Sequence, residues 1–401
     1  MLPANTLSTA SKVIGLALCV ALLSNFLFGE SLAKSRPARA WRLFSGGELQ
    51  TAFMEEEPVG RHLRIAIINH VTHHYEVVLP LLHAFVNQPN TTVELFATQK
   101  GLSNFGIKPL FDALGNDTNF RTRSFSDLDR LEYTPDLAVL VTCSRDINDL
   151  PKQFTTLSSR KSPKEVLCMM HDSGEWSIPK TGYRKLVQKW IEASRINIIT
   201  LSPHVNDYLT EYLPKWNMSL PLADPFAKTY AANQTRLLPA FPPVFDTTLS
   251  THIQPFIAMQ GYLESNRRNY THILTALQQN LPLLQSFQQK YSNVSISIFG
   301  SDNNHPGRGP QSSIPKDLKP FVKFHINLPY PEYYALMSSA IGILPAFAAP
   351  EYLQSRASSS IGAAVIVGTP PIATKEIVGA YRYLDGESGE AYWTQEEGES
   401  E

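Results

Sequence analysis

Short apolar runs rich in β-branched residues recur along residues 62–240, and stretches with helical spacing lie between them. The first run is Leu63 to Ile68, and apolar residues at helical spacing then extend from Val77 to Phe85. The other runs are Val93–Ala97, Leu137–Thr142, Val166–Met170 and Ile196–Leu201. Strands that alternate with helices predict a parallel sheet covered by helices on both faces. Residues 62–240 are therefore predicted to form one α/β domain.

A second pattern of the same kind follows a proline-rich stretch, Leu237 to Val244, which we interpret as a linker. Its predicted strands are Pro255–Met259, Val294–Phe299, Val322–His325, Ile341–Leu344 and Pro371–Ala373, and its predicted helices are Tyr270–Gln279, Glu332–Ser339 and Ser358–Val367. Residues 241–385 thus form a second α/β domain, and residues 386–401 an acidic tail predicted to be disordered. Ligands of open parallel sheets bind beyond the carboxyl ends of the strands. We expect two Rossmann-like domains that face a cleft.

An uncharged apolar run, Val13 to Phe28, precedes the first domain and is slightly shorter than the roughly 20 residues of a membrane-spanning helix. Residues 1–33 are therefore either a signal anchor or a signal peptide that is cleaved near Ser31 and Ala33, and residues 34–61 form a polar stem. Basic residues after the run favour a cytosolic body by the positive-inside rule. Glycosylation sequons favour a lumenal body instead. They begin at Asn90, Asn116, Asn217, Asn233, Asn269 and Asn293. We expect a lumenal body at a membrane of the Golgi or the endoplasmic reticulum.

The composition narrows the class of protein. Of the 401 residues, 43% are hydrophobic and 18% are charged, and the formal net charge is -1. This is an ordinary globular balance without the basic excess of a nucleic-acid-binding protein, so no nucleic-acid partner is expected. Cys143 and Cys168 each close an apolar run, and either a disulfide in an oxidising lumen or two buried free thiols fits that pattern. The chain has no CxxC or Cys/His zinc spacing, so no structural metal is expected.

The stretch from Ala349 to Thr374, APEYLQSRASSSIGAAVIVGTPPIAT, carries the clearest candidate chemistry. An acidic residue, Glu351, precedes a serine cluster at residues 358–360 that opens a predicted helix. Hydroxyls and free backbone N–H groups at a helix N-terminus can hold a diphosphate without a metal. The alternative is that Ser358 is a helix cap without a ligand.

A second candidate stretch is QGYLESNRRNY, residues 260–270. Gly261 follows a predicted strand, and Arg267 and Arg268 stand at the start of the next helix. A guanidinium there can pair with phosphate oxygens, and the alternative is a solvated pair of arginines.

In this order, the two stretches resemble the nucleotide-sugar-binding domain of GT-B glycosyltransferases, most closely the fungal-type glycosyltransferase group 1 family. The resemblance also rests on IFG at 298–300, on LPYPEYYALMSSAIGILPAF at 328–347, and on SSSIGAAVIVGTPPIA through Tyr381. It implies a metal-independent hexosyltransferase-like enzyme that uses a nucleotide sugar as co-substrate. It implies donor binding by residues of both stretches and a catalytic role for Glu351. The implied donor-binding residues are Gly261, Arg267, Arg268, Ser358, Ser359 and Thr369.

Two features depart from the family's pattern. Ala363 stands where many retaining GT-B enzymes have a second glutamate, and the chain ends soon after Tyr381, where the family continues into a further helix. These departures support an alternative function, a catalytically degenerate GT-B protein that serves as a lumenal binding or scaffold subunit. A sugar-nucleotide epimerase is a third alternative, and the apparent secretory segment argues against it.

Histidines follow two of the predicted strands of the first domain. His70, His73 and His74 fill the loop after the first strand, where they either line the cleft, bind a metal or are solvated. His171 follows the strand that ends at Met170, and the resemblance implies that it faces the donor or the reacting centre as a hydrogen-bond donor or general base. Asp172 is the alternative base. Asp127-Leu-Asp129 has the letters of a metal-binding DxD motif but lacks the apolar strand that such a motif needs.

The resemblance therefore implies a glycosyltransferase that transfers a sugar from a nucleotide-sugar donor to an unknown glycan, lipid or protein acceptor. It is expected to contact a membrane through its N-terminal segment.

Overall fold

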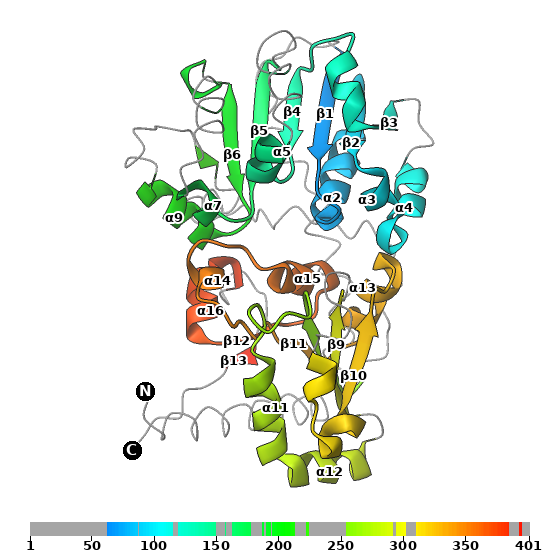
Figure 1. The fold of residues 1–401 in the computed structure, drawn as a ribbon, viewed down its shortest axis with the longest axis vertical. Coiled ribbons are helices and arrows are strands. Elements are labelled where there is room, and N and C mark those ends of the chain that lie inside the picture. Colours follow the sequence, from blue (N-terminus) through cyan, green and yellow to red (C-terminus); the bar gives the residue numbers. More distant parts are fainter. Residues whose placement is uncertain are drawn as a thin grey trace. The chain divides into compact units, whose positions relative to one another are not determined.

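The computed structural model describes residues 62–86, 88–114, 119–149, 157, 163–177, 187, 190–193, 195–212, 222–223, 254–291, 294–301, 310–384 and 393–394. These residues form two compact units (Figure 1). The N-terminal unit holds the described residues up to Ala223 together with Leu353–Ala357, and the C-terminal unit holds the described residues from Gln254 to Tyr352 and from Ser358 onward. The N-terminal apolar run, the stem and the predicted linker lie outside the described residues, as do the sequons at Asn116, Asn217, Asn233 and Asn293.

The N-terminal unit is built on a seven-stranded sheet with the order β3-β2-β1-β4-β5-β6-β7. The strands are β1 Leu63–Asn69, β2 Thr91–Ala97, β3 Phe120–Arg123, β4 Leu137–Leu140, β5 Glu165–Met170, β6 Ile196–Thr200 and β7 Leu222–Ala223. All neighbouring strands pair in parallel. The helices between them are α2 Tyr75–Val86, α3 Gln99–Ser103, α4 Ile107–Leu114, α5 Cys143–Asp149, α7 Gly174–Ser177 and α9 Pro203–Tyr212.

The strand order reverses between β1 and β4, which lie side by side at the centre of the sheet (Figure 1). Ile65 of β1 pairs with both Val93 of β2 and Leu137 of β4. In open parallel sheets, ligands bind outside the carboxyl ends of the strands at such a reversal. The loop after β1 and the turn after β4 therefore occupy the most favourable place for a ligand in this unit.

The C-terminal unit has a four-stranded parallel sheet with the order β10-β9-β8-β11. Its strands are β8 Phe256–Gln260, β9 Ser295–Gly300, β10 Val322–Ile326 and β11 Gly342–Ile343. The helices are α11 Tyr270–Gln279, α12 Leu281–Lys290, α13 Tyr330–Ser338, α15 Ser359–Val367 and α16 Lys375–Ala380. A short helix, α14 Glu351–Gln354, begins in this unit, and its last two residues belong to the N-terminal unit. A separate pair of short strands, β12 Ile372–Ala373 and β13 Trp393–Thr394, lies beside this sheet, and a single bridge joins Ile343 to Pro371.

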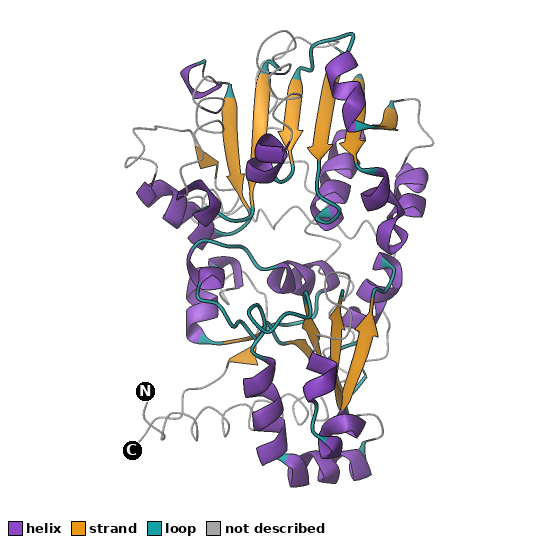
Figure 2. Cartoon of the chain, viewed as in Figure 1, coloured by secondary structure: helices purple, strands orange, loops and turns teal. Residues whose placement is uncertain are grey.

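The predicted fold class, α/β with two parallel sheets, is confirmed by this strand pairing (Figure 2). Every apolar run predicted as a strand lies within two residues of an observed strand. The prediction of a disordered tail is wrong at Trp393 and Thr394, because they pair with β12. Within the part of the chain that the structure describes, no helix has both the length and the apolar character needed to cross a membrane.

A disulfide joins Cys143, the first residue of α5, to Cys168 in β5. Their Cα atoms lie 5.2 Å apart, and both residues are buried. The disulfide closes a loop with a sequence separation of 25 residues, for which loss of chain entropy in the unfolded state predicts about 3–4 kcal/mol of stabilisation. Of the two alternatives that the sequence left open for these cysteines, the structure has the disulfide.

Candidate functional site

In the C-terminal unit, the candidate donor site starts at Gly261, directly after β8. Its backbone has a φ of +142°, which favours glycine, and its N–H donates to the carbonyl of Phe299. A Cβ at this position would lie 2.6 Å from Nη2 of Arg268. Gly261 is therefore needed for two reasons, its backbone conformation and the guanidinium that packs against it.

Arg268 is only 3% exposed, and its guanidinium is held on several sides. It donates from Nε to the carbonyl of Gln260 (2.9 Å), from Nη1 to the carbonyl of Arg267 (3.0 Å) and from Nη2 to Oγ of Ser360 (2.8 Å). The rings of Phe347 and Tyr352 lie 5.8 and 5.4 Å from its Cζ. Burial lowers the pKa of this guanidinium, although an arginine remains charged.

The partners of Arg268 are neutral. Among the described residues, no carboxylate contacts its guanidinium. A buried charge is ordinarily paired with an opposite charge, because burial without a partner costs several kcal/mol. Arg268 thus supplies uncompensated positive charge inside the C-terminal unit.

Arg267 behaves differently from its neighbour. Its Nε lies 3.1 Å from Oε2 of Glu264, and its Cζ lies 4.9 Å from the ring of Tyr262. Its side chain is 38% exposed. Of the two arginines that the sequence proposed for the diphosphate, only Arg268 reaches the serine cluster.

The serine cluster forms the N-terminus of α15. Ser358 is the cap residue, and its hydroxyl accepts a hydrogen bond from the N–H of Ser360. Ser359 is exposed, and its hydroxyl lies 3.3 Å from Oε1 of Gln260. Ser360 Oγ lies 2.9 Å from the carbonyl oxygen of Gln260 as well as accepting from Arg268. The cluster therefore joins the helix N-terminus, the end of β8 and the buried guanidinium.

Two residues of this site were missed by the sequence analysis. Gln260, the last residue of β8, contacts both Ser359 and Ser360 through its side chain. The hydroxyl of Tyr381 accepts from the N–H of Ser358 (3.0 Å) and donates to the carbonyl of Tyr352 (2.9 Å). The position of Gln260 directly before Gly261 was the available signal, whereas the contact of Tyr381 depends on packing across 23 residues of chain.

Glu351 and Thr369 lie apart from the hydrogen-bonded cluster. Glu351 is exposed and is the first residue of α14. Thr369 is buried beyond the C-terminal end of α15, and its hydroxyl donates to the carbonyl of Met337. At about 1.5 Å per helical residue, Thr369 is on the order of 16 Å along the helix from Ser358. The structure brings together Gly261, Arg268, Ser358 and Ser359, and Thr369 has a contact inside the fold instead.

The predicted histidines lie in the N-terminal unit at the carboxyl ends of β1 and β5. The N–H of His70 donates to Oδ1 of Asp146 (2.9 Å). The ring of His74 lies 4.4 Å from that of His73 and 4.0 Å from that of His171, measured between centroids. His74 also contacts Glu76 through Nδ1 at 3.1 Å. The loop after β1 and the residue after β5 thus form one cluster of imidazoles.

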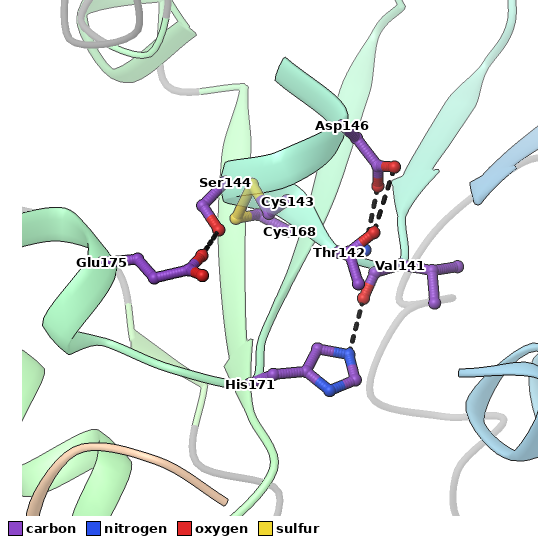
Figure 3. The surroundings of a disulfide bond; sticks show 8 residues. All are labelled: Val141, Thr142, Cys143, Ser144, Asp146, Cys168, His171 and Glu175. Carbon is purple, nitrogen blue, oxygen red and sulfur yellow. Dashed lines mark hydrogen bonds between the residues drawn. A yellow bond between two sulfur atoms is a disulfide. The ribbon is translucent and has the colours of Figure 1, made fainter. Parts of the chain in front are cut away.

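His171 has a distinct environment within that cluster (Figure 3). Its Nε2 lies 2.8 Å from the carbonyl oxygen of Val141. Burial, together with nearby His74, lowers the pKa of His171 well below its ordinary 6.5. The ring is therefore neutral near pH 7.

Asp172, the alternative base, is engaged by an arginine. Its Oδ2 accepts from Nε of Arg356 at 2.6 Å, and its Oδ1 accepts from the N–H of Gly174. Arg356 belongs to Leu353–Ala357, the segment that packs in the N-terminal unit. The same segment accepts a hydrogen bond at Ser355 from Ser173 and donates one from Ala357 to the carbonyl of His171. Asp172 therefore anchors this segment beside His171.

The described residues offer no group of three or more His, Cys, Asp or Glu side chains that could hold a metal ion. Asp127 and Asp129 lie in a 3-10 helix, Phe125–Arg130, rather than on a strand. The carboxylate of Asp127 accepts from the N–H of Ser124, as in a capping box. Asp127 therefore has a local capping role.

The chain matches no protein-family model, and no curated protein matches it in sequence. Solved structures resemble it in fold. One is the lipopolysaccharide outer core galactosyltransferase WaaB in its apo form, with 13% identity and a TM-score of 0.42 over 78% of this chain and 80% of that chain. Another is HepE of Anabaena in complex with UDP and glucose, with 13% identity and a TM-score of 0.46 over 78% and 81%. A UDP-N-acetylglucosamine 2-epimerase from Rickettsia bellii also matches, with 13% identity and a TM-score of 0.37 over 84% and 86%. These similarities describe the fold alone.

Proposed function

We propose that this chain is a metal-independent glycosyltransferase of the GT-B kind, related to the fungal-type group 1 family, that transfers a sugar from a nucleotide sugar. The observation that carries the proposal is Arg268, a buried guanidinium with neutral partners at the N-terminus of α15. The diphosphate of a nucleotide sugar would supply the missing negative charge, and the free N–H groups at the start of α15 would donate to its oxygens.

The chemical role of this site follows from the charge that develops in the reaction. When the sugar leaves, the nucleoside diphosphate gains negative charge, and a positioned cation and N–H donors stabilise it in place of a metal ion. Gly261 and Ser359 would contact the diphosphate through backbone and hydroxyl groups, and exposed Glu351 would act near the sugar. His171 of the N-terminal unit would contact a hydroxyl of the donor sugar or the acceptor, with His70 and His73 nearby.

A lumenal location is part of the proposal. Disulfides persist in oxidising compartments and are rare in the cytosol. The buried Cys143–Cys168 disulfide therefore supports a body in the secretory pathway, with the N-terminal apolar run as its signal or anchor.

Release of nucleoside diphosphate from a panel of nucleotide sugars, with and without chelator, tests the function. We expect one donor to be turned over equally in both conditions. Arg268→Met keeps the apolar volume and removes the charge, and we expect activity to fall about 100-fold or more. Arg267→Ala is the matched control, and it should change activity only slightly. Full activity in a folded Arg268→Met variant would refute the assigned diphosphate site.

The alternative, a degenerate GT-B scaffold subunit, is favoured by Ala363. This residue is 3% exposed inside α15, so no carboxylate is available at the position of the family's second glutamate. A folded chain that binds no nucleotide sugar but co-purifies with an active transferase would support this alternative.

A further inference from the structure

The β4–α5 turn, residues Val141–Asp146, comprises the two residues between β4 and α5 and the first turn of α5, and it lies at the carboxyl end of a central strand (Figure 3). In the sheet, β4 has β1 on one side and β5 on the other. The turn contacts the chain that leaves both neighbours. The carbonyl of Val141 faces Nε2 of His171 after β5, and Oδ1 of Asp146 accepts from the N–H of His70 after β1.

Covalent and polar contacts hold this turn in place. Cys143 within the turn is bonded to Cys168 in β5, three residues before His171. Asp146 accepts from both the N–H (2.9 Å) and the hydroxyl (3.1 Å) of Thr142. The hydroxyl of Ser144 donates to Glu175 of α7. The carbonyl of Val141 is thus presented to His171 by a turn with few ways to move.

The contact with Val141 determines which nitrogen of His171 carries the proton. A carbonyl oxygen only accepts hydrogen bonds, so Nε2 must be the protonated nitrogen. The second nitrogen of a neutral imidazole then has a lone pair and is an acceptor. Among the described residues, the ring of His171 makes its hydrogen bond to Val141, packs on the ring of His74 and interacts electrostatically with Glu76 and His73, and no described donor occupies Nδ1.

We propose that the disulfide-locked β4–α5 turn is the positioning element of His171, and that it fixes this ring with Nδ1 as the acceptor of a hydrogen bond from a sugar hydroxyl. The identification of the ligand as a sugar rests on the proposed function, whereas the tautomer does not. An acceptor nitrogen attracts a hydroxyl and repels phosphate oxygens. His171 therefore meets the sugar or the acceptor, and the diphosphate belongs to the site around Arg268.

Long-range proton–nitrogen NMR of the full chain, labelled with ¹⁵N-histidine, tests the tautomer directly. The spectrum of His171→Gln assigns the signals of His171 among the 11 histidines. We expect widely separated shifts for the two ring nitrogens, with the directly bonded proton on Nε2. A proton on Nδ1 in the wild-type protein would overturn the proposal.

Removing the disulfide between Cys143 and Cys168 tests the role of the β4–α5 turn. In Cys143→Ser with Cys168→Ser, we expect the separation of the two nitrogen shifts to shrink, because the ring exchanges between tautomers. Cys19→Ser is the control that removes a cysteine outside the turn, and it should leave the spectrum unchanged. If the double variant does not fold, Thr142→Val decides the question, since it removes one contact to Asp146 and keeps the disulfide. A wild-type tautomer in every folded turn variant would overturn the positioning role.

This readout is independent of transfer activity. A smaller separation of the two ring-nitrogen shifts in the turn variants, with intact nucleotide binding, would confirm the positioning role whether or not transfer is measured. Absence of any nucleotide binding, with the Nε2 proton and its dependence on the turn intact, would refute the proposed function and keep the role of the turn.

Discussion

At the scale of single residues, Gly261 and Arg268 depend on each other. The backbone of Gly261 has a positive φ, and the space that a side chain would occupy there is filled by the guanidinium of Arg268. Because this guanidinium also donates hydrogen bonds to Gln260 and Ser360, it has little freedom to move aside. A side chain at position 261 should therefore displace the guanidinium and disturb the whole candidate site.

We predict that Gly261→Ala destabilises the protein by about 1–3 kcal/mol, since it combines an unfavourable φ with a steric clash. Denaturant unfolding followed by circular dichroism measures the change. Gly379→Ala is the matched control, because this glycine lies in α16 with nothing within 4 Å of an added Cβ. It should stabilise by about 0.5–1 kcal/mol. Equal midpoints for the two variants would contradict the packing described for Gly261.

Asp146 shows how a buried residue makes stability depend on pH. Burial raises the pKa of this carboxyl from 3.8 to about 6, against hydrogen bonds from His70 and Thr142 that lower it. The folded state therefore binds this proton more tightly than the unfolded state. The stabilisation from that proton is fully present below about pH 4 and is lost as the pH rises through about 6.

The side chain in Asp146→Asn is neutral at every pH, so the variant should not lose this stabilisation as the pH rises. We predict that the unfolding free energy of the variant, relative to wild type, rises by up to about 3 kcal/mol between about pH 4 and pH 7. Urea unfolding at a series of pH values measures it. Parallel pH profiles for the two proteins would show that the carboxyl of Asp146 titrates normally.

The sequence indicated the segments that form the candidate site, but not the contacts of their individual side chains. A glycine after a strand and two arginines before a helix were visible in the chain, but adjacent arginines look equivalent. Which one turns inward depends on Phe347 and Tyr352, about 80 residues away in sequence. The hydroxyl of Thr369 looked similar to those of the serines, and its burial against Met337 follows from how α15 packs.

At the scale of elements, α15 carries the serine cluster because its two ends are well defined. Ser358 caps its start, and Gly368, with a φ of +64°, ends it in the left-handed conformation. Ile361, Ala363, Ala364 and Val367 between these ends are apolar and buried, so the helix packs inside the C-terminal unit with its N-terminus near Gln260. A capped and buried helix presents its first N–H groups in a fixed direction.

We predict that Ser358→Ala lowers stability by about 1 kcal/mol, because the helix loses its cap. Ser359→Ala should change stability by less than about 0.5 kcal/mol, since Ser359 is exposed, and should instead weaken nucleotide binding. Thermal unfolding and nucleotide titration of both variants separate capping from ligand contact. An equal loss of stability in both would contradict the assignment of Ser358 as the cap.

Elements were predictable where apolar residues dominate and were missed where charges replace them. The run Phe120–Arg123, FRTR, has too few apolar residues to predict a strand. It nevertheless pairs with β2, where buried Glu94 lies 3.1 Å from Arg123 and 3.4 Å from Arg121. An ion pair across strands thus takes the place of hydrophobic burial at this edge. Neither the FRTR run nor the segment around Glu94 indicates this pairing when it is read by itself.

At the scale of the whole molecule, the chain consists of two α/β units with parallel sheets, and each presents chemistry at the carboxyl ends of its strands. The C-terminal unit has a buried cation at the N-terminus of a helix, and the N-terminal unit has a neutral histidine with a predicted acceptor nitrogen. In the proposed function, the C-terminal unit would bind the donor diphosphate and the N-terminal unit would contact sugar hydroxyls. The cleft expected from the sequence remains a prediction.

The central claim is a metal-independent site for a nucleoside diphosphate around Arg268, and calorimetric titration of the full chain tests it most directly. We predict micromolar binding of one nucleoside diphosphate, unchanged by chelator, unaltered in Arg267→Ala and weakened at least about 10-fold in Arg268→Met. No heat of binding from the folded protein, or binding that chelator abolishes, would contradict the account.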